Sequence, residues 1–142
     1  MREQFVPYEI ALKLKEKGFD KPCLLQEGYI FSYFGESKYR FHSQLGGGPF
    51  GTDLKGKKNS DLKGELPKYK DWVLIPLWQQ VIDWLREKHF IDIMIRQTQK
   101  DGTAYYKITK IETEDKIKGY SNFCKTVNIA RQAAIEHALT LI

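Results

Sequence analysis

Residues 90–112 read FIDIMIRQTQKDGTAYYKITKIE, and this stretch decides the fold class. Its first half alternates apolar and polar residues, a pattern that predicts a strand with Ile91, Ile93 and Ile95 on one buried face. Asp101-Gly102 is a dipeptide typical of tight hairpin turns, and the residues after it are rich in β-branched and aromatic side chains. The stretch therefore predicts a β-hairpin.

The residues on both sides of this hairpin indicate helices. PLWQQVIDWLREKH predicts a helix that begins at Pro76, and its apolar residues recur at helical spacing. KIKGY, at 116–120, predicts a third strand, and Thr126 is placed to cap a last, alanine-rich helix. Residues 77–142 thus read helix, strand, strand, strand, helix. The inward side chains of the first of these helices are Trp78, Val81, Ile82 and Leu85, and those of the last are Val127, Ala130, Ala134, Ala138 and Leu141.

The N-terminal third of the chain predicts one helix followed by strands. Pro7 suits the first turn of the helix and Gly18 its end, where a left-handed glycine would let Phe19 pack back on Leu14. Further on, the segments CLLQ, GYIFSYF and YRFH have the composition of strands. GES, at 35–37, is read as the turn between the last two segments.

Residues 45–70 interrupt this pattern. GGGPFG disfavours both helix and strand, and the repeat of TDLKG as SDLKG eight residues later is typical of successive turns. We therefore expect a flexible, exposed Gly/Lys-rich loop at about 45–70.

The chain has 142 residues, 42% of them apolar, and is long enough to bury a core without disulfides or metals. We expect a single α+β domain, residues 1–142, in which an antiparallel β-sheet carries its helices mainly on one face. Cys23 and Cys124 are expected to be reduced thiols. The N-terminus lacks the pattern of a secretory signal and no apolar run is long enough to span a membrane, so we expect a cytoplasmic protein without membrane contact.

Catalytic and metal-binding patterns are weak throughout the sequence. The segment 51–58 approaches a phosphate-binding loop, but Lys58 stands where that motif needs a Ser or Thr hydroxyl. His42, His89 and His137 do not pair with one another or with a cysteine at metal-ligand spacing, and His89 is read as a group that faces the helix dipole. The sequence therefore assigns no catalytic, cofactor-binding or metal-binding residue, and it favours a protein that is not an enzyme.

The formal net charge is +5, and most of the excess lies between residues 45 and 70. A lysine-rich segment of this kind suits a phosphate backbone, although Asp53, Asp61 and Glu65 lie among its lysines. The candidate nucleic-acid contacts are Lys55, Lys57, Lys58, Lys63, Lys125 and Arg131.

The order of elements in 77–142 resembles the double-stranded-RNA-binding domain, and ARQAAIEHAL, at 130–139, resembles the alanine-rich last helix of that family. The resemblance implies phosphate contacts from the start of this helix, where only Lys125 and Arg131 stand in for the family's lysine cluster and Glu136 opposes them. The same order is also similar to the arm-type DNA-binding domains of phage integrases. The topology therefore leaves the ligand open.

Three blocks of the chain resemble a family of small uncharacterised Bacteroidetes proteins that are often met in prophage or mobile-element surroundings. The blocks are QFVPYEIALKLKEKGFDKPC, PLWQQVIDWLREKH and ARQAAIEHALTLI. This resemblance implies a bacterial, phage-related origin, but no activity, cofactor or site residue. We expect a non-enzymatic accessory protein that acts as an interaction module with a protein partner. The alternative is a nucleic-acid-binding module that uses the basic loop.

Overall fold

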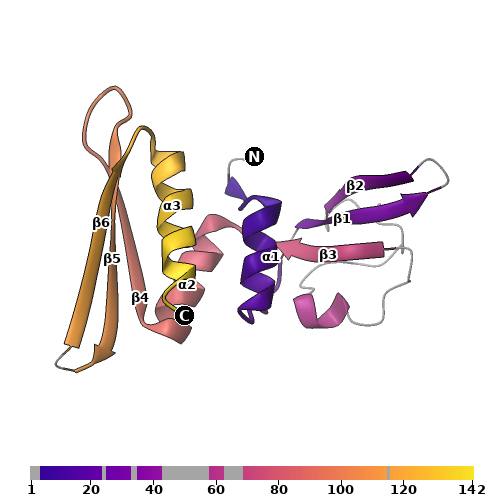
Figure 1. Ribbon diagram of the computed structural model, residues 1–142, viewed down its shortest axis with the longest axis horizontal. Helices are drawn as coiled ribbons and strands as arrows, with labels where there is room; N and C mark the ends of the chain where they lie inside the picture. The colour runs from indigo at the N-terminus through magenta and orange to yellow at the C-terminus, as the bar shows by residue number, and fades with distance from the viewer. Residues whose placement is uncertain (1–3, 24, 33–34, 43–57, 63–68, 115) are drawn as a thin grey trace. The chain divides into compact units, whose positions relative to one another are not determined.

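The computed structural model describes residues 4–23, 25–32, 35–42, 58–62, 69–114 and 116–142. Within these ranges the chain forms helices and strands in mixed order, which confirms the predicted α+β class (Figure 1). In chain order these elements are α1 (Tyr8–Glu16), β1 (Leu25–Ser32), β2 (Gly35–His42), the 3-10 helix η3 (Asn59–Leu62), β3 (Tyr69–Ile75), α2 (Trp78–His89), β4 (Ile91–Gln97), β5 (Ala104–Thr113), β6 (Lys116–Cys124) and α3 (Val127–Leu139).

These elements form two compact units, Met1–Leu77 and Trp78–Ile142. Each unit has its own three-stranded antiparallel sheet, β2-β1-β3 in the first and β4-β5-β6 in the second. The sequence predicted one antiparallel sheet, and the structure differs from it in having two. The reason is that β3, which the sequence pattern did not reveal, completes a sheet with β1 and β2 before the chain reaches α2.

Helix α1 ends as the sequence predicts. Gly18 adopts a left-handed conformation with φ of 84°, which glycine reaches without a steric penalty. Its amide donates to the carbonyl of Lys15 at 3.1 Å, and the amide of Phe19 donates to the carbonyl of Leu14 at 2.8 Å. Phe19 and Leu14 are both buried. This is the Schellman arrangement, and it turns the chain back over the last turn of the helix.

Strand β2 begins earlier than predicted. The β1–β2 register runs from Leu25 opposite His42 to Ser32 opposite Gly35, so that residues 35–37 belong to β2. The prediction that GES forms the turn is therefore wrong. Gly35 already pairs with Ser32 of β1, and residues 33–34 lie outside the described residues.

Part of the predicted loop at 45–70 is anchored in the core of the first unit. Asn59 is only 7% exposed, and its side chain bonds to two backbone groups. Its Nδ2 donates to the carbonyl of Phe19 at 3.0 Å, and its Oδ1 accepts from the amide of Leu74 at 3.0 Å. Ser60 adds two bonds to the carboxylate of Asp20, from its amide at 2.8 Å and from its hydroxyl at 2.7 Å.

The expectation of an exposed loop is therefore wrong for Asn59, and also for residues 69–70, which begin β3. This strand pairs with β1 because its second half, Val73, Leu74 and Ile75, is fully buried. The rest of the predicted loop, 45–57 and 63–68, lies outside the described residues.

Both cysteines are free, which confirms the prediction of reduced thiols. Cys23 is buried in the first unit, and its thiol donates to the carbonyl of Lys21 with 3.3 Å between sulfur and oxygen. Burial, with a smaller contribution from the negative charge of Asp20, raises the pKa of the Cys23 thiol to about 12.

The hairpin predicted from residues 90–112 is confirmed as β4 and β5. Ile91 and Ile93 are buried, and Ile95 is half-buried. The connection is longer than a two-residue turn: the amide of Thr98 donates to the carbonyl of Thr103 at 2.8 Å, and Gly102 takes a φ of 97°. The third predicted strand is also present, as β6.

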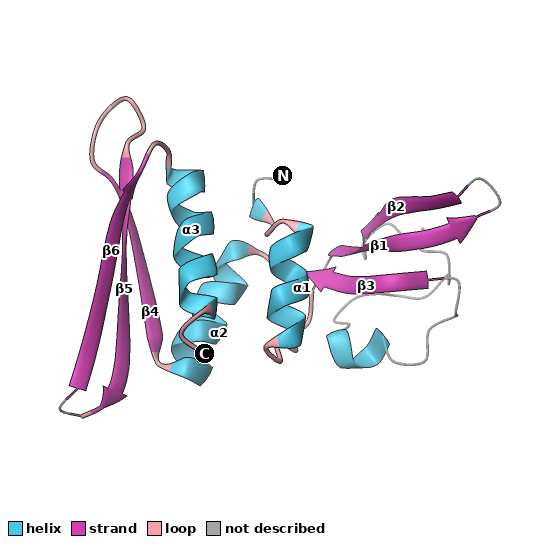
Figure 2. Ribbon diagram, in the orientation of Figure 1, coloured by secondary structure: helices cyan, strands magenta, loops and turns pink. Residues whose placement is uncertain are grey.

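Helices α2 and α3 cover one face of the β4-β5-β6 sheet (Figures 1 and 2). Thr126 caps α3 as predicted, because its hydroxyl accepts from the amide of Ile129 at 3.2 Å. The buried side chains of α3 are Ala130, Ala134, Ile135, Ala138 and Leu139. Small residues at four-residue spacing let the helix lie close to the strands.

Helix α2 begins at Trp78, two residues after the predicted start. Pro76 instead accepts a hydrogen bond from the amide of Val6 at 3.0 Å, and Leu77 pairs with Phe5. Trp78 is buried as predicted, at 9% exposure, but Trp84 is more deeply buried at 2%. The buried face of α2 therefore includes Trp84, which the sequence pattern did not assign to it.

Phe90, directly after α2, is the non-glycine residue with positive φ in the described ranges, at 56°. Its side chain is 63% exposed, so burial offsets little of the cost of this left-handed conformation. We expect Phe90→Gly to raise the free energy of unfolding by about 0.5–1 kcal/mol, because glycine is the usual residue after a helix end of this kind. Urea denaturation followed by circular dichroism measures this change.

Phe90→Ala is the control for this prediction. Alanine keeps the Cβ atom that makes the left-handed conformation costly, so it should give no gain. Equal stability of the glycine and alanine variants would show that the backbone at this position is not strained.

Candidate functional site

The face of the β4-β5-β6 sheet opposite α2 and α3 carries side chains that the core of the second unit does not use. Antiparallel pairing sets these side chains in rows across the three strands. We call the row nearest the β4–β5 connection the hairpin row; it consists of Arg96, Tyr105 and Phe123. The next row is Met94, Lys107 and Ser121, and the third is Asp92, Thr109 and Gly119. We call this whole surface the open face.

The hairpin row contains a pair of neighbouring aromatic rings. The ring centroids of Tyr105 and Phe123 lie 5.8 Å apart, with 48° between the ring planes. Phe123 is 72% exposed and Tyr105 is half-buried. The rings are therefore not stacked on each other, and the phenyl ring of Phe123 is open to the surroundings of the unit.

Four exposed cations belong to the hairpin row, to the next row or to the segments that adjoin these strands: Arg96, Lys100, Lys107 and Lys125. Arg96 belongs to the row and Lys107 to the next one. Lys100 lies in the β4–β5 connection, and the carbonyl of Lys125 lies 3.9 Å from the place where Gly102 would carry a Cβ atom. Within the described ranges, no carboxylate forms an ion pair with any of the four cations.

The opposite end of the sheet has a different electrostatic character. Glu112 forms ion pairs with Lys118 at 2.8 Å and with Lys116 at 3.2 Å. Hydrogen bonds from Lys118 and Lys116 lower the pKa of the Glu112 carboxyl, which keeps it ionised. The charge of the lysines at this end is thus partly offset by Glu112, whereas the cations near the hairpin row have no carboxylate partner among the described residues.

Apolar side chains are also exposed at that end. The amide of Ile111 donates to the carbonyl of Phe90 at 3.0 Å, and Ile111 pairs with Ile117 across the strands. We call these three residues the apolar row. Their exposures are 63% for Phe90, 49% for Ile111 and 62% for Ile117. An apolar surface of this kind is typical of an interaction site.

The candidate nucleic-acid residues of the sequence analysis lie in different places. Lys55, Lys57 and Lys63 are outside the described residues, and Lys58 is exposed next to η3 in the first unit. Lys125 is exposed near the hairpin row. The guanidinium carbon of Arg131 lies 5.8 Å from the ring centroid of Trp78, so this side chain packs on α2.

The sequence patterns did not mark four residues of this site as candidates: Arg96, Tyr105, Lys107 and Phe123. A signal was present for those on β4 and β5, because the alternation that buries the isoleucines places the residues between them on the other face. No local signal brings Phe123 beside Tyr105, since that neighbourhood depends on the β5–β6 register.

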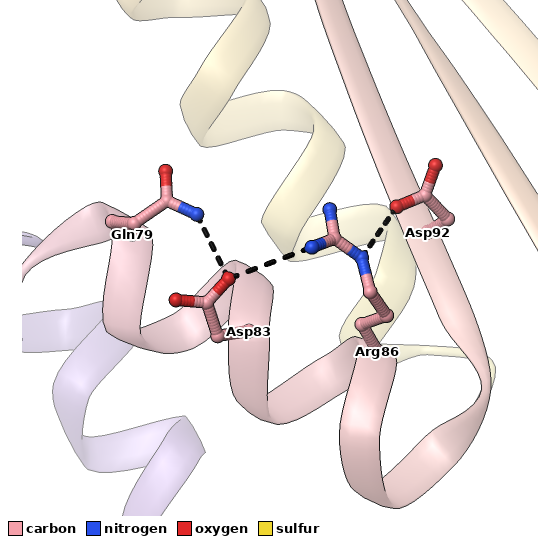
Figure 3. A network of polar contacts seen from close by, with 4 residues as sticks. All are labelled: Gln79, Asp83, Arg86 and Asp92. Atoms are coloured by element: carbon pink, nitrogen blue, oxygen red, sulfur yellow. Dashed lines mark hydrogen bonds and ion pairs between the residues drawn. The ribbon is translucent and has the colours of Figure 1, made fainter.

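A polar network on the edge of the second unit joins α2 to β4 (Figure 3). Nε of Arg86 donates to Oδ1 of Asp92 at 2.8 Å, and a second guanidinium nitrogen of Arg86 lies 3.7 Å from Oδ1 of Asp83. Gln79 donates to the same oxygen of Asp83 at 2.8 Å. The Arg86 side chain is 54% exposed, and ion pairs that are this accessible to water contribute little to stability or to chemistry.

The histidines of the second unit have structural contacts. Burial, and then the charges of Lys88 and Lys110, lower the pKa of His89, which disfavours the charged ring that an interaction with the helix dipole requires. Its ring packs against Trp84 with 4.6 Å between centroids. Nδ1 of His137 lies 3.3 Å from the hydroxyl of Tyr106. In the ranges that the structure describes, no three His, Cys, Asp or Glu residues lie together as a metal site would require.

Comparison with protein-family models, with curated proteins and with solved structures finds no match to this chain. Among the described residues, no helix has the length and apolar character needed to cross a membrane. Function is therefore inferred from the geometry and charge of the open face.

Proposed function

We propose that the Trp78–Ile142 unit is a nucleic-acid-binding module and that its ligand lies on the open face, against the hairpin row. The observation that carries this proposal is the separation of charge along the sheet. Cations without a carboxylate partner among the described residues gather at one end, whereas Glu112 holds the lysines of the other end in ion pairs. Unpaired, exposed cations on one surface are the typical feature of proteins that contact phosphates.

The four cations belong to separate elements near the hairpin row. Arg96 and Lys107 project from β4 and β5, Lys100 from their connection, and Lys125 from the segment between β6 and α3. A polyanion that crosses the open face beside the row would meet the positive charges of Arg96 and Lys107. Binding of this kind releases counterions, so its affinity falls steeply with salt.

This surface differs from the one that the sequence analysis considered. The resemblance to double-stranded-RNA-binding domains implies contacts from the start of α3, through Lys125 and Arg131. Because Arg131 packs over Trp78, the cations available around α3 are fewer than that resemblance implies. Lys125 supports both surfaces, and the open face supplies the additional charge of Arg96 and Lys107.

Two double variants with the same change in formal charge test the proposal. Arg96→Ala/Lys107→Ala should weaken binding of a labelled 20-mer by about tenfold or more at low salt, and should flatten the slope of log affinity against log salt by roughly one unit for each cation removed. Lys116→Ala/Lys118→Ala should change affinity little, because these lysines lie at the other end of the sheet and Glu112 partly offsets their charge. Fluorescence anisotropy measures both.

Two results would contradict the proposal. Equal losses in the two double variants would show a nonspecific response to net charge. Absence of binding by the wild-type chain at low salt, with both single-stranded and duplex probes, would remove the nucleic-acid function altogether.

The second candidate is the one that the sequence analysis favoured, an interaction module with a protein partner. The observation in its favour is the apolar row of Phe90, Ile111 and Ile117, whose exposed side chains contribute little to the core of the unit. Either candidate suits a cytoplasmic, non-enzymatic accessory protein of a bacterial phage or mobile element, which is the origin that the sequence resemblance implies. Absence of nucleic-acid binding would leave the protein-binding role as the first candidate.

A further inference from the structure

We infer that the ligand of the open face is a single strand and that its unpaired bases stack on Tyr105 and Phe123. This inference rests on the proposed function and deepens it, since it names the form of the nucleic acid and the residues that distinguish it. The cations of the site do not make this distinction, because both single strands and duplexes carry phosphates.

The aromatic pair is the feature that selects a single strand. Phe123 is 72% exposed, so it contributes little to the core and remains accessible to a ligand. The rings belong to neighbouring strands, are 5.8 Å apart and are inclined by 48°, so they do not cover each other's faces. Exposed aromatic rings bind the flat faces of bases, and they do so with little regard to sequence.

The side chains that neighbour Phe123 along β6 are small enough to leave room for a base. Next to Phe123 on the open face of β6 come Ser121 and then Gly119, which carry a small side chain and none. A Cβ atom added to Gly119 would meet only the carbonyl oxygen of Ile108, at 4.0 Å, so the space above the glycine is open. A base stacked on Phe123 therefore meets no bulky neighbour along β6.

The positive charges of the open face lie beside the aromatic rings, close to the phosphates of a nucleic-acid strand whose bases stack there. Arg96 stands opposite Tyr105 in the hairpin row, and Lys107 follows two residues along β5 on the same face. Residues at this spacing on one face of a strand are about 7 Å apart. If the bases of a nucleic-acid strand stack on the rings, its phosphate backbone therefore lies close to these cations.

A duplex cannot make the same contacts. Its bases are paired and stacked within the helix, so their faces are hidden and only their edges and the phosphates reach a protein. On this surface a duplex would use the cations and leave the rings without a partner. The open face should therefore prefer a single strand to a duplex of the same length.

The test compares Tyr105→Leu and Phe123→Leu in the full chain with Phe90→Leu, which changes another exposed aromatic residue of the same unit. The probes are a labelled single-stranded 20-mer of thymidine and a 20-base-pair duplex at one salt concentration. The wild type should bind the single strand at least about tenfold more tightly. Each hairpin-row variant should lose roughly fivefold to a hundredfold in single-strand affinity, the range for one base–aromatic stack, with duplex affinity and the Phe90→Leu control unchanged.

A conservative variant and a spectroscopic measurement separate stacking from a general loss of structure. Phe123→Trp should retain or increase single-strand affinity, because a larger ring stacks at least as well. A single strand that contains 2-aminopurine should change its fluorescence on binding to the wild type and not on binding to Phe123→Leu.

The outcomes distinguish this inference from the proposed function. Equal affinities for single strand and duplex, lost in Arg96→Ala/Lys107→Ala but kept in Phe123→Leu and Tyr105→Leu, would overturn the stacking inference and leave the nucleic-acid function standing. Absence of binding to either probe would overturn both. Selective loss of single-strand binding in the two leucine variants supports both.

Discussion

Trp84→Ala should lower the free energy of unfolding of the second unit by about 3–5 kcal/mol, the range for truncation of a well-packed aromatic residue. Trp84 is 2% exposed and lies on the inner face of α2 with Val81 and Leu85, which are fully buried. Its ring also packs against His89. Alanine would leave a large cavity where this ring is buried. Hydrogen exchange of the β4 and β5 amides, measured at increasing urea concentrations, reports the loss of stability in this unit.

Ile129→Ala is the matched control, because Ile129 is a large apolar residue of the same unit that is 51% exposed. Its truncation should cost less than about 1 kcal/mol, as is usual for surface positions. Similar losses for the alanine variants of Trp84 and Ile129 would show that Trp84 does not contribute to the core of the second unit.

Asn59→Leu should destabilise the first unit by about 2–4 kcal/mol, because leucine has a similar size but cannot form either hydrogen bond. The carbonyl of Phe19 and the amide of Leu74 would lose the side-chain partner that each has in the native structure. The loss should appear in the exchange of the β3 amides, and only weakly in those of β5.

Ser60→Ala provides the comparison within the same 3-10 helix. It removes the hydroxyl bond to Asp20, but that bond is exposed, and water can replace it at a cost of less than about 1 kcal/mol. If Asn59→Leu and Ser60→Ala cost the same, the buried bonds of Asn59 do not hold this segment to the core.

The elements that the sequence predicts well depend on neighbours along the chain. Gly18, Phe19 and Leu14 form the end of α1 within six residues, and Thr126 caps α3 through an amide three residues later. The alternation of β4 likewise specifies its own buried face. In each case the physical cause of the structure lies inside the window that a sequence pattern covers.

The missed features depend on contacts between distant residues. Asn59 bonds to groups that are 40 and 15 residues away, and nothing in a lysine-rich turn marks one asparagine as buried. A short apolar run is formed by the buried residues Val73, Leu74 and Ile75. Periodicity alone does not assign so short a run to a strand or to a helix. For this reason the sequence did not reveal that β1 and β2 form a separate sheet with β3 in the first unit.

The residues of the candidate site also fall into two groups, those that a local sequence pattern places and those that depend on contacts between distant residues. That Arg96, Tyr105 and Lys107 share a face follows from the alternation of a hairpin, and the sequence was sufficient to find it. The proximity of Phe123 to Tyr105 depends on the register of a third strand. The contrast between paired and unpaired lysines depends on the reach of the Glu112 side chain, which no pattern of residues encodes.

The buried thiol of Cys23 is a natural probe of the opening of the first unit. With a pKa of about 12, only about one thiol in a hundred thousand is ionised at neutral pH, and the thiolate is the form that attacks alkylating reagents. Because Cys23 is also only 1% exposed, we expect its alkylation to occur from open states of the unit, in which the thiol regains its ordinary acidity. The labelling rate of this one natural cysteine, read by mass spectrometry, then gives the population of the open state under native conditions, without denaturant and without an introduced probe.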